Sequence, residues 1–173
     1  MSSKTNAKER TRLIAWEDPM IAAKAAQSMS GFDYLTAIAN GSLPPPPISI
    51  LMNLEFAEVK EGRVVFTVEP GEYHYNPAGV VHGGLAATLV DSAMTCAITS
   101  MAPAGMAYTT IELHVNYIRP ITTSTGLIRS IGEVIHVGRR VATAEAKILD
   151  ADDKLYAHAT TTCLAVQLNP NNR

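Results

Sequence analysis

Cysteine, concentrated positive charge and uninterrupted apolar runs are all scarce in this sequence, and each scarcity argues against a class of protein. Only two cysteines, Cys96 and Cys163, occur in 173 residues. Neither belongs to a CxxC motif or to the Cys/His spacing of a zinc site, so a structural metal or a redox motif is not predicted. Unpaired cysteines fit the reducing cytoplasm, which is the location we expect.

The charges of the chain are balanced and dispersed. Fourteen lysines and arginines oppose 16 acidic residues, the net charge is −2, and no basic block occurs. Nucleic acids and anionic bilayers are bound through concentrated positive charge, so neither is an expected partner. No apolar segment of the kind found in export signals follows the basic residues of the N-terminus. The longest apolar stretch, residues 83–104, contains Asp91 and several hydroxyl residues, which predicts a buried helix rather than a membrane span.

Several common catalytic motifs are also missing. The sequence contains no GxSxG elbow and no GxxxxGK phosphate loop, which argues against a serine hydrolase and a P-loop enzyme. Its five histidines show neither HxxxH nor HxH spacing, so no metal and no other cofactor are expected.

The chain divides at a run of four prolines, residues 44–47. Before it, residues 19–39 have roughly helical apolar spacing interrupted by Gly31, which predicts one or two short helices. The prolines themselves are expected to form a stiff polyproline linker. Residues 1–47 are therefore interpreted as an N-terminal helical arm, and residues 48–173 as the main domain.

The pattern of predicted helix and strands in the main domain is that of an α+β protein. Its helix, residues 84–100, is apolar nearly all round and must be covered on most sides, which a curved antiparallel sheet can do. Short turns between the last three strands imply antiparallel neighbours. On the strand at residues 110–117, alternation predicts one face with Thr110, Glu112, His114 and Asn116, and the other with Ile111, Leu113, Val115 and Tyr117. The predicted strands are 48–59, 63–68, 110–117, 127–137, 141–149 and 155–166.

Asp91 lies in the middle of the apolar helix, where burying an unpaired carboxylate would cost several kcal/mol. One interpretation places it on a polar edge of the helix beside Thr88, Ser92 and Thr95. The other makes it a catalytic carboxylate in a tuned environment. The helix alone leaves both open.

Gly83 and Gly84 begin the same helix. Their backbone N–H groups lie at the positive end of the helix dipole, where they could stabilise the oxyanion of an attacked carbonyl, although an ordinary helix entry would look the same. Asp91 follows Gly83 by eight residues, about 12 Å along the axis, too far for both to act on one carbonyl. If both are catalytic, two chains must share the site, which predicts a symmetric dimer.

Three segments together resemble the phenylacetate-degradation (PaaI-type) branch of hotdog-fold acyl-CoA thioesterases. They are Asn76-Pro77-Ala78-Gly79-Val80-Val81-His82-Gly83-Gly84, then Asp91, then Tyr108-Thr109-Thr110-Ile111-Glu112-Leu113 with Asn116-Tyr117 and Arg119-Pro120. The resemblance covers residues 48–166. It implies a central helix wrapped by six antiparallel strands, homodimers that commonly pair into tetramers, and hydrolysis of acyl-CoA to a free acid and CoA.

The resemblance also implies residue roles. Asp91 would be the nucleophile or general base, and Gly83 would supply the oxyanion-hole N–H. Asn76 would lie near the carbonyl or the attacking water, His82 would shape the loop, and Thr110 would orient water or the carboxylate. Taken alone, Asn76 is also a turn former, His82 a helix-entry residue and Thr110 an ordinary strand residue.

The phosphates of CoA require cationic partners, for which a solvated turn is the competing interpretation. Tyr75, Met94 and Met101 are suggested walls for the acyl group, whose identity the sequence leaves open. Two other functions compete with hydrolysis: a hotdog dehydratase or hydratase, and a non-catalytic acyl-CoA-binding module. The candidates for CoA binding are Gly84, Arg119, Arg129, Gly138, Arg139 and Arg140.

Overall fold

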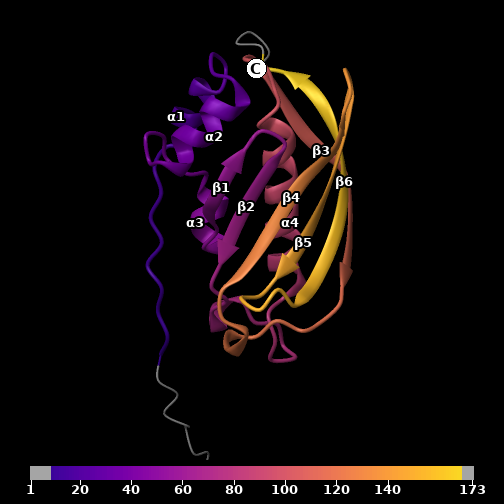
Figure 1. Ribbon diagram of the computed structural model, residues 1–173. Coiled ribbons are helices and arrows are strands. Elements are labelled where there is room, and N and C mark those ends of the chain that lie inside the picture. Colours follow the sequence, from indigo (N-terminus) through magenta and orange to yellow (C-terminus); the bar gives the residue numbers. More distant parts are fainter. Residues whose placement is uncertain (1–8, 169–173) are drawn as a thin grey trace, which may run out of the picture.

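Helix α4 (Gly83–Thr99) forms the centre of the molecule, and six antiparallel strands curve around it (Figure 1). The computed structural model describes residues 9–168. The strand order is β1-β2-β4-β5-β6-β3, so β1 and β3 are the two edges of the sheet. This arrangement is the hotdog fold, as predicted. The strands are β1 (Glu55–Lys60), β2 (Arg63–Val68), β3 (Met106–Tyr117), β4 (Ile128–Val137), β5 (Val141–Leu149) and β6 (Leu155–Gln167).

Helix α4 is buried on the face that the sheet covers, as its apolar sequence predicts. Eight of its apolar side chains are at most 3% exposed and pack against β2, β4 and β5. The residues left half-buried recur every three or four positions and form one stripe, which runs through Gly84, Thr88, Asp91, Thr95 and Thr99. Asp91 therefore lies on the less covered side of a core helix. Within residues 9–168, no helix is long and apolar enough to span a bilayer.

Two short helices of the arm, α1 (Met20–Ala25) and α2 (Gly31–Ala39), confirm the expectation for residues 19–39. Gly31 begins α2 rather than only interrupting a helix, because Ser30 caps α2 by accepting a hydrogen bond from the Asp33 N–H. A Cβ at Gly31 would lie 1.6 Å from the carbonyl oxygen of Thr99. Glycine thus allows the arm to dock against the end of α4, beside β1 (Figure 1).

The prediction of a strand from residue 48 is wrong at its start. Helix α3 (Pro47–Met52) occupies that segment, and β1 begins only at Glu55. Pro47 is the first helical residue, where a missing N–H costs nothing and the fixed φ suits a helix. The extended proline segment therefore ends at Pro46, whose φ of −63° and ψ of 142° are those of polyproline. Two short 3₁₀ helices, η1 (Glu72–His74) and η2 (Thr123–Thr125), lie in loops.

A β-bulge in β3 corrects the predicted faces of that strand. Thr110 pairs with Cys163 and Glu112 pairs with Thr162, so Ile111 is an extra residue. Alternation reverses at this point. Thr110 therefore shares the inner face, toward α4, with Leu113, Val115 and Tyr117, whereas Glu112, His114 and Asn116 face outward.

Candidate active site

The carboxylate of Asp91 is held by a hydroxyl group from the sheet. Thr110 Oγ1 donates to Asp91 Oδ1 over 2.8 Å and lies 3.2 Å from Thr95 Oγ1. Because Thr110 has one proton to give, Thr95 is the donor in the second contact. No hydrogen bond within residues 9–168 engages the other carboxylate oxygen. Asp91 is thus fixed on one side and available on the other.

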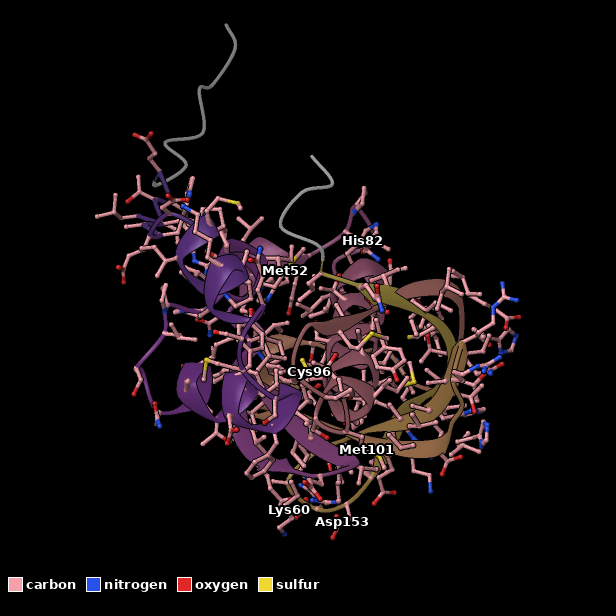
Figure 2. All side chains as sticks on the ribbon, turned by 90° about the horizontal axis from the view of Figure 1, so that it is seen from above. Met52, Lys60, His82, Cys96, Met101 and Asp153 are labelled. Atoms are coloured by element: carbon pink, nitrogen blue, oxygen red, sulfur yellow. The ribbon has the colours of Figure 1, made fainter. Side chains whose placement is uncertain are left out.

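Cys96 follows Asp91 by five residues on α4 and is close enough to be affected by its charge. Its burial, and secondly the negative charge of Asp91, raise the pKa of the Cys96 thiol to about 12. Burial and the neighbouring Cys96 also raise the pKa of Tyr34 on α2. Figure 2 labels Cys96 near the middle of the molecule, between the N-terminal helices and the sheet. The Cys96 thiol is therefore neutral at ordinary pH, and it acts as a small apolar group rather than as a nucleophile.

The start of α4 leaves one backbone donor free. The imidazole Nδ1 of His82 accepts a hydrogen bond of 2.8 Å from the Gly84 N–H, which fixes His82 as the cap of the helix. A Cβ at Gly84 would lie 2.8 Å from that nitrogen, so glycine makes room for the cap. The Gly83 N–H has no partner in the part of the chain that the structure describes. Gly83, rather than Gly84, is the available donor.

Tyr117 covers Gly83, a contact that the sequence did not indicate. Its hydroxyl donates to the Gly83 carbonyl over 3.2 Å, and its ring lies 3.2 Å from where a Cβ of Gly83 would stand. Strict alternation placed Tyr117 on the face away from Thr110. Only the bulge at Ile111 turns both side chains toward α4.

Asn76 is turned into its own loop. Its side-chain oxygen accepts hydrogen bonds from the N–H groups of Ala78 at 2.9 Å and Val80 at 3.4 Å. The loop ends in a bridge between Tyr75 and Val81, directly before His82. The carboxamide oxygen thus shapes the approach to α4, and only the side-chain NH₂ could meet a substrate.

A single chain does not bring Gly83 and Asp91 together. They lie on one continuous helix with about 12 Å of axial rise between them. Asp91, Thr110 and Thr95 form one cluster, while His82, Gly83 and Tyr117 form another nearer the start of α4.

The candidate CoA ligands are divided between the two ends of β4. Arg119 donates to the Leu155 carbonyl, and Arg129 pairs with Asp153 and donates to the Asp150 carbonyl. Both lie at the end where β4 starts. Arg139 and Arg140 are exposed in the turn after β4, about 30 Å away along the strand, and Gly138 closes that turn by donating to Val141.

The three suggested acyl-pocket walls do not form one pocket. Met94 is fully buried in the core, and Met101 is 48% exposed beyond α4. The Tyr75 hydroxyl bonds to Thr123 in η2, which is the main reason why the pKa of Tyr75 is lowered.

The protein is of the hotdog class: six antiparallel strands wrap a helix, and the less covered side of that helix carries a carboxylate that a threonine holds. The thioesterase superfamily profile matches residues 78–157, from the loop before α4 into β6. A solved structure of a protein from the thioesterase superfamily is 30% identical, with a TM-score of 0.65, over 79% of this chain and 98% of that one. The chain belongs to the thioesterase superfamily of hotdog-fold proteins.

Two further relatives have more specific names. A 1,4-dihydroxy-2-naphthoyl-CoA hydrolase from Listeria monocytogenes serotype 1/2a (strain 10403S) is 29% identical over 105 residues, covering 60% of this chain and 83% of the relative. A phenylacetic acid degradation-related protein from Ralstonia eutropha JMP134 is 25% identical, with a TM-score of 0.69, over 76% of this chain and 98% of that one.

Proposed function

We propose that this protein hydrolyses acyl-CoA thioesters to a free acid and CoA. The observation that carries the proposal is the Asp91 carboxylate, which Thr110 holds through one oxygen while the other stays available. A protein that only binds acyl-CoA has no need for a charge beside its core. The Listeria relative, a hydrolase of an acyl-CoA, supports the same reaction. The phenylacetate-degradation branch remains our assignment within the superfamily, supported by the Ralstonia neighbour.

In the proposed reaction Asp91 takes a proton from water, and the water oxygen attacks the thioester carbonyl carbon. The carbonyl oxygen becomes an oxyanion that accepts a hydrogen bond from the Gly83 N–H. Collapse of this intermediate breaks the C–S bond, and the departing thiolate takes up the proton. Alternatively, Asp91 attacks directly, CoA leaves and water opens the resulting anhydride. Transfer of ¹⁸O from water into Asp91 during a single turnover would distinguish the second route from the first.

We further propose that the working unit is a dimer, in which Asp91 of one chain acts with Gly83 of the other. The 12-residue strand β3 is an edge of the sheet and so presents an unpaired row of backbone groups. It also carries three large apolar side chains that are exposed in the single chain: Ile111, Leu113 and Tyr117. Pairing β3 with a second copy would cover both features and unite the two halves of the site.

For the CoA phosphates we propose Arg139 and Arg140 as the main cationic ligands. Their guanidinium groups are exposed and have no hydrogen-bond partner within residues 9–168, whereas Arg129 is already paired with Asp153. Gly84 and Gly138 then serve through the shape of the backbone, and Arg119 lies near the start of α4. The free thiols of Cys96 and Cys163 suit a cytoplasmic location.

The test is free-thiol release from a panel of acyl-CoAs by the wild-type protein and by Asp91→Asn. We expect release by the wild type and a loss of about 10²-fold or more in kcat for the variant. Binding of acyl-CoA without thiol release would favour a binding module instead. Release of water from a hydroxyacyl-CoA would favour a dehydratase.

A further inference from the structure

A cavity of about 490 Å³ lies between the N-terminal arm and the end of the hotdog core, away from the Asp91 cluster. Its walls come from α1 and α2, from the end of α4, from the start of β3 and from the end of β6. They include three alanines, two methionines and two tyrosines, with Gln27 and Gln167 as polar members, a mixture that is usual in pockets for small molecules. Among the lining residues are Ala23, Ala26, Tyr34, Thr99, Met106 and Tyr108.

Two elements run from Asp91 to this cavity. Along α4, Thr95 and Thr99 follow Asp91 at successive turns on one face, a distance of about 12 Å. Along β3, Tyr108 precedes Thr110 by two residues and Met106 by four, all on the inner face, about 13 Å in length. Asp91 and Thr110 are hydrogen-bonded at one end, and Thr99 and Met106 line the cavity at the other.

The seam between the two elements is only partly covered in a single chain. Thr95, Thr99 and Tyr108 are each half-buried, so each leaves part of its surface uncovered between Asp91 and the cavity, beside the contact of the Thr95 and Thr110 hydroxyls. Cys96 follows Thr95 on α4 and has a thiol whose pKa burial raises, and Tyr34 of α2, whose pKa is raised by burial and by the neighbouring Cys96, lines the cavity. In Figure 2 Cys96 lies between the purple helices of the arm and the strands, which agrees with these interactions.

We propose that the cavity binds the distal part of an extended medium-chain acyl group whose thioester carbonyl lies at Asp91. The inference deepens the proposed function and rests on it. At about 1.25 Å per carbon, a span of about 12 Å needs eight to ten carbons. A benzoyl or phenylacetyl group reaches only about 6 Å from the carbonyl, so it would meet the near wall at Tyr108 and leave most of the cavity empty. The arm is therefore the element that sets the acyl length.

The test compares specificity constants, measured by thiol release, for acyl-CoAs from acetyl to palmitoyl and for phenylacetyl-CoA. The wild-type protein should prefer octanoyl- to dodecanoyl-CoA over butanoyl-CoA by about tenfold or more, because each buried methylene adds to binding. Ala26→Phe fills the cavity and should lower the ratio of the decanoyl to the butanoyl constant about tenfold. Ala25→Phe, a change at the neighbouring alanine that does not line the cavity, should leave that ratio unchanged.

The outcomes separate the two proposals. Thiol release by the wild type with the same chain-length ratio in Ala26→Phe, or a preference for phenylacetyl-CoA, would overturn the cavity assignment and leave hydrolysis standing. No release from any acyl-CoA would overturn the proposed function and the acyl assignment with it. If thermal melting shows that Ala26→Phe is unfolded, Ala23→Leu is used instead, because it adds a smaller side chain to the same wall of the cavity. It must also lower the ratio of the decanoyl to the butanoyl specificity constant.

Discussion

The hydroxyl of Thr110 donates a hydrogen bond of 2.8 Å to Oδ1 of Asp91, which joins the edge strand β3 to the central helix α4. Because of the bulge at Ile111, Thr110 and the later residues Leu113 and Tyr117 all face the helix. A regular strand would turn Tyr117 away from Gly83 whenever Thr110 faced Asp91. One extra residue in β3 thus supplies side chains to both halves of the proposed site.

Replacing Thr110 with valine keeps the shape of the side chain and removes the hydroxyl. We expect kcat to fall about tenfold with little change in KM, because a charge-assisted hydrogen bond that orients Asp91 is lost. Steady-state kinetics on the best acyl-CoA provides the measurement. Thr110→Ser should recover most of the activity, and equal kcat values for valine and threonine would show that the hydroxyl has no positioning role.

Gly83 offers a direct test of the oxyanion donor. It is the first helical residue, a position where proline fits the backbone but has no N–H. Gly83→Pro should lower kcat about 10²- to 10³-fold, the usual cost of losing one oxyanion-hole donor. Gly83→Ala is the matched control, since it keeps the N–H and requires only a shift of the exposed Tyr117 ring. A similar loss in both variants would point to crowding and argue against the donor.

The thiol of Cys96 reports on the charge of Asp91. Burial and the neighbouring carboxylate both disfavour the thiolate and raise its pKa from 9.0 to about 12. The rate of carboxymethylation of Cys96, followed by peptide mass spectrometry, should therefore stay low from pH 7 to 9, where an ordinary thiol becomes steadily more reactive. Asp91→Asn removes the charge and should increase the rate at pH 9. A rate in the wild type that levels off near pH 9, as for a thiol with an ordinary pKa, would contradict this.

Much of the core could be predicted from local patterns. Helix α4 is apolar nearly all round because the sheet covers most of it, and β5 alternates because one of its faces is buried, so each pattern has a direct physical cause. The turn at Gly62, with φ of 75°, requires the residue that the sequence places there. Asp91 could be identified from the sequence because burying an unpaired carboxylate in an apolar helix is costly.

The parts that could not be predicted depend on contacts between distant segments. The bulge at Ile111 is fixed by pairing with β6, about 50 residues later, and alternation carries no mark of it. The cavity depends on how Gly31 lets the arm approach Thr99, whereas the sequence marks Gly31 only as a break in a helix. Pro47 could begin a helix or continue an extended run, and local sequence did not decide between them.

Sharing of the site between two chains is tested most directly by mixing two inactive variants. Asp91→Asn and Gly83→Pro are unfolded together, refolded and assayed for thiol release, with hybrid dimers counted by native mass spectrometry. Each hybrid has one site with both groups intact, and half of a random mixture is hybrid, so about a quarter of the wild-type activity should return. Hybrid dimers that form but remain as inactive as the separate variants would contradict a shared site.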